Sequence, residues 1–130
     1  MRPEGGLAAF LAGFVHAGRG LALAAAERNF RVELTVAGLV LLAGWLLRLG
    51  PGEWALLILC ISWVLGMEAL NTAVERLADR VSRAHDPLIK QAKDLAAAGV
   101  LLSALGAAVI GLIVFIPHLA ALLQHHPLTP

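Results

Sequence analysis

The sequence contains few of the residues on which secreted scaffolds and nucleic-acid binders depend. It has no tyrosine, a single cysteine, and charged residues at only 15% of its 130 positions. One cysteine cannot form a disulfide within the chain. A net charge of +1 provides no basic field that would attract nucleic acid. We therefore expect neither a disulfide framework nor a nucleic-acid partner.

The residues that remain are mostly apolar. Hydrophobic residues make up 59% of the chain, and the mean hydropathy is +0.81. Soluble domains average about half apolar and about a quarter charged residues. The excess excludes a disordered chain and indicates a membrane protein. The length of 130 residues favours a single domain, which we place at 1–130.

Three apolar runs are expected to form membrane-spanning helices. The run 95–116 has 22 residues without a charge, enough to cross a hydrocarbon core of about 30 Å at about 1.5 Å per residue. The run 34–47, edged by Glu33 and Arg48, and the run 54–67 lie on either side of a Gly-Pro-Gly break. That break ends one helix and redirects the next. The predicted spans are 32–49, 53–82 and 92–116.

The two ends of the chain are expected to lie outside the membrane core. Residues 7–26 place apolar side chains at helical spacing beside His16 and Arg19, which predicts an amphipathic helix on the membrane surface. A signal peptide is the alternative, but Arg2 is offset by Glu4. Residues 119–130 are predicted to be a frayed surface tail. The fold class is therefore an all-α membrane protein with one surface helix and three membrane helices.

Basic residues set the expected orientation. They precede the first span and lie between the second and third, whereas only Arg48 lies at the Gly-Pro-Gly turn. Because cytoplasmic loops are enriched in Lys and Arg, the N-terminus is expected in the cytoplasm and the C-terminus outside.

Four polar residues share one face of the second span. Glu68, Asn71, Glu75 and Asp79 fall within an arc of about 80° at about 100° per residue. A carboxylate near hydrocarbon is unfavourable unless it is paired or binds a cation, so this face is a functional candidate. Interhelical hydrogen bonds or a solvated helix end are the structural alternative. That alternative suits Asp79 better than Glu68, which follows fourteen uncharged residues.

Two further clusters are expected at the same cytoplasmic level. Glu27 precedes the first span and could join Glu75 as an oxygen ligand of magnesium. Lys93 opens the third span beside the pair Lys90 and Asp94, and its ammonium group suits phosphate oxygens. The structural alternatives are an interfacial anchor for the first cluster and positive-inside flanking for the second.

The three clusters together match the needs of phosphoryl transfer. That reaction uses a cation bridging the phosphates, basic groups, and a base that orients the attacking hydroxyl. Glu68 suits the base, since apolar surroundings strengthen a carboxylate as a proton acceptor. The sequence has no P-loop, protein-kinase or zinc-protease motif. Because three short spans cannot enclose a nucleotide, we expect a homo-oligomer whose copies share the active sites.

The motifs resemble those of a known family. Residues 68–79 read EALNTAVERLAD and residues 90–98 read KQAKDLAAA, which is similar to the small prokaryotic integral-membrane diacylglycerol kinase family. The resemblance covers roughly residues 27–117. The stretches ERNFR at 27–31 and EWA at 53–55 are similar to its undecaprenol kinase branch.

The resemblance implies a homotrimer of three-span protomers in the bacterial inner membrane. It implies that Glu68 is the catalytic base and that Glu27 and Glu75 hold the magnesium ions of MgATP. It also implies a role in the nucleotide and phosphate site for Asn71, Lys93 and Asp94.

The predicted function is ATP-dependent phosphorylation of undecaprenol to undecaprenyl phosphate at the cytoplasmic interface. A diacylglycerol kinase that makes phosphatidic acid is the second hypothesis, with the same site and a different lipid. A carrier or channel with a carboxylate relay is the third. The third hypothesis fits less well, because the polar groups gather at one interface instead of crossing the bilayer.

Overall fold

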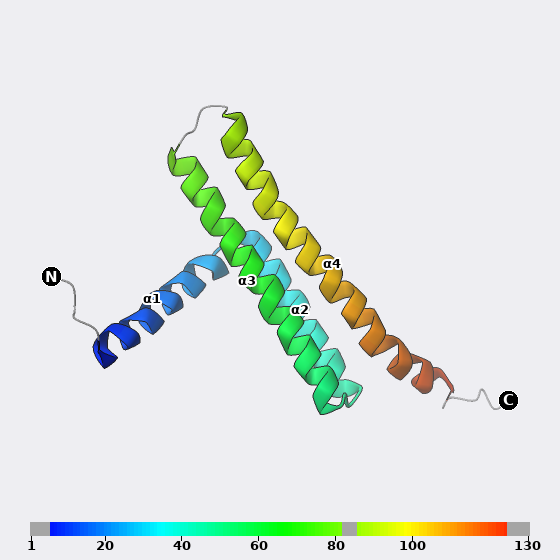
Figure 1. Cartoon of the computed structure of the whole chain (residues 1–130). Coiled ribbons are helices and arrows are strands. Elements are labelled where there is room, and N and C mark those ends of the chain that lie inside the picture. The colour runs from blue at the N-terminus through cyan, green and yellow to red at the C-terminus, as the bar shows by residue number, and fades with distance from the viewer. Residues whose placement is uncertain (1–5, 82–85, 125–130) are drawn as a thin grey trace.

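The chain folds into long helices. The computed structural model describes residues 6–81 and 86–124, and no β-strand occurs among them. Its helices, drawn in Figure 1, are α1 (Leu7–Ala25), α2 (Arg28–Leu46), α3 (Pro51–Val81) and α4 (Pro87–Gln124). Each is long and apolar enough to cross a membrane. This confirms the all-α membrane fold.

The first helix differs from the expectation of one surface helix and three membrane helices. α1 has 19 residues with a mean hydropathy of 1.5, so four helices of the described chain meet the requirements for a membrane span. The reason is that His16 and Arg19 are its only polar side chains. In Figure 1, α1 runs across the direction of the other three helices and away from them.

The bundle consists of α2, α3 and α4, with α3 packed against both neighbours. α2 ends in a Schellman motif, in which the Arg48 amide donates to the Trp45 carbonyl at 3.2 Å and the Leu49 amide to the Gly44 carbonyl at 3.1 Å. Arg48 takes the left-handed conformation that this motif requires, with φ of 55°. Pro51 then begins α3, where its missing N–H costs no hydrogen bond.

The last helix is longer than the sequence pattern predicts. α4 begins at Pro87 and continues through Pro117 to Gln124, so the prediction of a frayed tail is wrong for residues 119–124. A proline removes one backbone hydrogen bond, and in apolar surroundings the flanking backbone groups are best satisfied within a helix. The rest of the predicted tail, residues 125–130, lies outside the described residues.

Most large apolar side chains of the single chain are exposed. The buried core at the Gly-Pro-Gly end comprises Leu49, Leu57 and Val114, whereas Leu102 on α4 remains 70% exposed. A soluble monomer does not expose a continuous apolar surface of this kind. The exposure is what a protein surrounded by lipid or by further copies requires.

Replacing Arg48 with glycine should stabilise the protein. A left-handed conformation is unfavourable for any residue with a Cβ, whereas glycine adopts it freely. We expect Arg48→Gly to raise the free energy of unfolding by about 0.5–1 kcal/mol, measured by thermal unfolding in detergent. Arg48→Ala keeps the Cβ and is the matched control. An equal gain in both variants would contradict the conformational explanation.

Candidate active site

The polar face of α3 changes from buried to exposed along the helix. Glu68 is 3% exposed and Asn71 is 6% exposed, whereas Glu75 and Asp79 are exposed. The Asn71 amide nitrogen donates a hydrogen bond to Glu75 Oε1 at 3.2 Å. The shared face predicted from the spacing is therefore confirmed, with its buried end within the apolar part of α3.

The buried carboxylate of Glu68 faces the beginning of α2. The Asn29 side chain lies beside the Glu68 carboxylate, and the carboxylates of Glu27 and Glu75 lie close enough to repel its negative charge. Glu33, one turn beyond Asn29 along α2, is a third acidic neighbour. Two elements distant in the sequence thus concentrate negative charge around one buried group. Such a cluster favours the binding of a cation or of a proton.

Glu27 lies at the site, as expected, but it already has a partner. Its Oε1 accepts a hydrogen bond from Arg76 at 2.6 Å, and both side chains are nearly half exposed. Within residues 6–81 and 86–124, no group of three or more His, Cys, Asp or Glu side chains is arranged to hold a metal ion. The carboxylates of Glu27 and Glu75 therefore do not form a complete metal cage by themselves.

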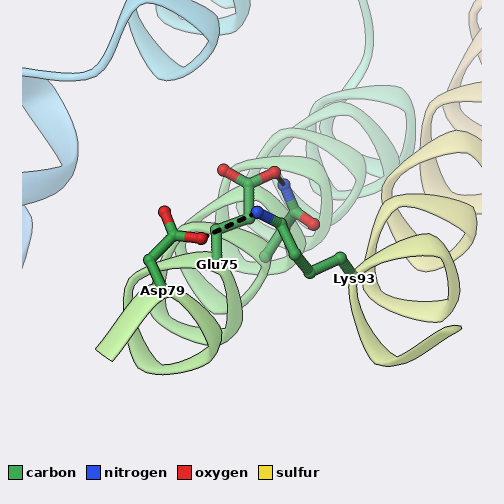
Figure 2. Close-up of polar contacts among 4 residues, drawn as sticks. Glu75, Asp79 and Lys93 are labelled. Carbon is green, nitrogen blue, oxygen red and sulfur yellow. Dashed lines mark hydrogen bonds and ion pairs between the residues drawn. The ribbon is translucent and has the colours of Figure 1, made fainter. Parts of the chain in front are cut away.

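The basic cluster reaches the acidic face through one ion pair. Lys93 Nζ on α4 donates to Asp79 Oδ1 on α3 at 3.0 Å, which is the dashed line in Figure 2. In the same view Glu75 lies beside this pair. Lys90 and Asp94 form the expected ion pair along α4, at 3.2 Å. Lys93 therefore joins the acidic face, whereas Asp94 pairs within its own helix.

Three contributors to the site were missed by the sequence analysis. The sequence pattern presents Arg76 only as one of the basic residues that indicate the membrane orientation. It presents Glu33 only as the edge of a span and Asn29 only as part of the ERNFR stretch at 27–31. In the described part of the chain, Glu33 Oε2 and Asn71 Oδ1 are buried without a hydrogen-bond partner. Unsatisfied buried polar atoms of this kind require an explanation, and a bound ligand is one. The signal that could have drawn attention to Glu33 is a carboxylate next to an uncharged run.

Comparison with known proteins assigns this arrangement to a family. Residues 15–115 match the family described as prokaryotic diacylglycerol kinase. The chain belongs to that family. It is a lipid kinase, and the carrier or channel hypothesis is set aside.

The chain is similar in sequence to individual members of the diacylglycerol kinase family. It is 42% identical over 111 residues to an undecaprenol kinase of Bacillus subtilis, covering 85% of this chain and 90% of that protein. It is 37% identical to a diacylglycerol kinase of Synechocystis, covering 87% of this chain and 66% of the relative. A diacylglycerol kinase of Pseudomonas aeruginosa is 42% identical over 89 residues, or 68% of this chain and 67% of the relative. The similarity to the undecaprenol kinase confirms the predicted branch.

The Arg76–Glu27 pair should contribute little to the stability of this kinase. Both side chains are substantially exposed, and exposed ion pairs contribute about 0–1 kcal/mol. In a double-mutant cycle of Arg76→Gln and Glu27→Gln, we expect a coupling energy below about 1 kcal/mol, measured by thermal unfolding in detergent. A coupling above about 2 kcal/mol would show that the pair is structural and that it does not readily open for a ligand.

Proposed function

We propose that this kinase transfers the γ-phosphoryl group of ATP to the hydroxyl of undecaprenol, which yields undecaprenyl phosphate and ADP. The observation that carries the proposal is the buried carboxylate of Glu68, placed between an exposed polar face and apolar helices. A lipid alcohol and a charged phosphate donor can meet only at such a boundary. The similarity to an undecaprenol kinase over 90% of that protein supports the choice of lipid.

In this mechanism Glu68 is the catalytic base. The hydroxyl oxygen of the lipid forms a bond to the γ-phosphorus while the bond from that phosphorus to the bridging oxygen of ADP breaks. Glu68 accepts the hydroxyl proton. Lys93 and Asn71 neutralise or orient the phosphate oxygens, and Asp94 helps to position the nucleotide. Phosphoryl transfer depends mainly on such positioning and charge stabilisation.

Magnesium fits the residues at the exposed end of this face. Glu75 is exposed, the neighbouring Asn71 Oδ1 lacks a partner in the described residues, and Glu27 offers a second carboxylate once Arg76 releases it. An all-oxygen set of one or two carboxylates plus substrate phosphates suits magnesium. When bound, the ion neutralises charge on the β- and γ-phosphates. Glu27 and Glu75 would hold it, and Arg76 would then be free to contact phosphate.

The assembly proposed for the kinase is a homotrimer with shared active sites. The exposed positions of Glu75 and Asp79 leave the polar face open on one side, and a second copy would close it. The direction of α1, away from the bundle (Figure 1), supports placing this helix along the cytoplasmic surface. With α2 to α4 as spans, the N-terminus would lie in the cytoplasm of a bacterium and the C-terminus outside.

Diacylglycerol is the second candidate substrate. The similarity to two diacylglycerol kinases, at 37% and 42% identity, favours it. The discriminating experiment offers the purified kinase undecaprenol and diacylglycerol side by side, with labelled ATP and magnesium. Faster phosphorylation of undecaprenol supports the proposal. Exclusive phosphorylation of diacylglycerol would overturn it.

Removing the charge of Glu68 should abolish turnover without unfolding the protein. A general base contributes about 10²–10⁴-fold to the rate, so Glu68→Gln should lower kcat by at least about a hundredfold. Size-exclusion chromatography should show an unchanged oligomer. Glu53→Gln on the same helix is the matched control, because glutamine can still accept the 2.7 Å hydrogen bond from the Gly50 amide. Activity of Glu68→Gln near that of the control would exclude Glu68 as the base.

Replacing Glu75 should change the response to magnesium. With one carboxylate ligand lost, Glu75→Gln should require about tenfold more magnesium for half-maximal activity, since a tenfold change corresponds to about 1.4 kcal/mol. Titration of magnesium at fixed ATP measures this directly. A titration that coincides with that of Glu53→Gln would argue against a ligand role for Glu75.

A further inference from the structure

Arg76 binds one of the two carboxylates proposed to hold magnesium. Its Nη2 atom donates a hydrogen bond to Glu27 Oε1 at 2.6 Å, the short distance that oppositely charged partners favour. Glu27 lies in the short connection between α1 and α2, and its side chain does not cap the amides that begin α2. The carboxylate is therefore directed toward α3, where Arg76 is its partner.

The second proposed ligand, Glu75, directly precedes Arg76 on α3. The Asn71 side chain, one turn earlier, donates a hydrogen bond to Glu75. Its own Oδ1 is buried and accepts no hydrogen bond from any residue that the structure describes. A buried oxygen without a partner requires an explanation. It points to a ligand beside Glu75 independently of the acidic residues, and Arg76 lies at the same place.

Arg76 competes with a free metal ion for Glu27. A magnesium ion lies about 2.0–2.1 Å from a ligating oxygen, so an ion on either carboxylate oxygen of Glu27 would lie close to the guanidinium, and the two positive charges would repel. Arg76 must therefore release Glu27, and it is then left without a counter-ion. Both side chains are nearly half exposed, so the pair opens at little cost. Arg76 thus weakens the binding of a free ion without preventing it.

The complex of the metal with a nucleotide provides a partner for each of the two separated charges. When Glu27 ligates the metal, Arg76 can donate to phosphate oxygens of the same nucleotide, for which its planar guanidinium is well suited. The exchange then leaves neither side chain unpaired. A free metal ion offers no acceptor to Arg76, and a free nucleotide offers no cation to Glu27.

We propose that Arg76 makes the site selective for the metal–nucleotide complex over the free metal ion. Arg76 holds Glu27 in the resting site, releases it to the metal, and then binds a phosphate group of the nucleotide that arrives with that metal. The inference rests on the proposed function, in which Glu27 and Glu75 hold the magnesium of MgATP. Because the exchange concerns binding, it can be measured without lipid and without turnover.

The first measurement titrates a free metal ion against the full chain in detergent. Manganese(II) replaces magnesium, because the unbound ion gives an electron paramagnetic resonance signal that is lost on binding; nucleotide and lipid are omitted. An exposed ion pair can lower the affinity of a competing ion by up to about fivefold. Arg76→Gln should therefore bind manganese about threefold or more tightly than wild type. Equal or weaker binding would overturn the proposal.

Two controls show whether this gain depends on Glu27. In a Glu27→Gln background the competition is already lost, so adding Arg76→Gln should change manganese binding by less than about twofold. Arg80→Gln removes an equal charge one turn further along α3 and leaves the pair of Arg76 and Glu27 intact. It should also have less than about a twofold effect at about 0.15 M salt, which screens exposed charges. A gain in either control as large as that in Arg76→Gln alone would overturn the proposal.

The second measurement determines binding of the metal–nucleotide complex. Magnesium is added with AMP-PNP, an ATP analogue whose γ-phosphoryl group is not transferred, and isothermal titration calorimetry gives the affinity in the same detergent. Arg76→Gln should bind this complex about fivefold or more weakly than wild type, because the lost hydrogen bonds to phosphate outweigh the relief of the competition. A merely structural role of Arg76 would not strengthen one affinity and weaken the other. Unchanged or tighter binding of the complex would overturn the proposal.

Arg76→Lys separates the charge from the shape of the guanidinium. Lysine keeps the positive charge but lacks the planar fork that binds phosphate. Arg76→Lys should therefore bind manganese as wild type does and should lose only part of the affinity for the complex. Manganese binding as tight as that of Arg76→Gln would contradict a competition between positive charges. Both variants should unfold at nearly the wild-type temperature, because the exposed pair contributes little to stability.

Failure of this inference can be separated from failure of the proposed function. Neither binding measurement contains lipid, and the kinase assay measures labelled phosphate on undecaprenol. Opposite effects of Arg76→Gln on the two affinities, without phosphorylation of undecaprenol, would refute the proposed function alone. Phosphorylation of undecaprenol without those opposite effects would refute the role of Arg76 alone.

Discussion

The architecture depends on one buried charge. Glu68 lies in the apolar part of α3 and is only 3% exposed, an arrangement that is unfavourable unless neighbours compensate for the lost solvation. The Asn29 side chain lies beside this carboxylate, at the end of α2 that packs against α3. The ion pair between Arg76 and Glu27 joins the same two segments at their exposed end.

A second set of contacts connects α3 to α4 at the site. The pair of Lys93 and Asp79 joins the two helices at the polar end. Closer to the middle, Gly99 on α4 lies against Met67 on α3, and a Cβ there would lie 2.6 Å from the terminal methyl of that flexible side chain. Lys93 is therefore placed beside the acids by the packing of α4 on α3 and by its ion pair with Asp79. A positive and a negative group are thus available together where phosphate would bind.

The molecule combines two surfaces with different solvent requirements. The polar residues of the site change from buried to exposed along the C-terminal end of α3, whereas most of the remaining helical surface is apolar. A phosphate donor needs the first surface and a lipid acceptor needs the second. An apolar groove between α2, α3 and α4, with Glu33 in its lining, belongs to the second surface.

The sequence alone determined the helical fold and the polar face of α3. Hydropathy and the 3.6-residue period are local properties, so the apolar runs and the alignment of Glu68, Asn71 and Glu75 follow directly from spacing. The same rules failed at Pro117, where α4 continues because one lost hydrogen bond does not end a helix in apolar surroundings.

Only the tertiary structure decided which of these groups meet. Arg76 and Glu27 are 49 positions apart, and the proximity of Glu33 to Glu68 depends on how α2 crosses α3. The sequence pattern of one helix does not specify how its neighbour is rotated about its own axis or shifted along it when the two pack. Those quantities come from side-chain packing between helices, and they turn separate charged residues into a site with an apolar groove beside it.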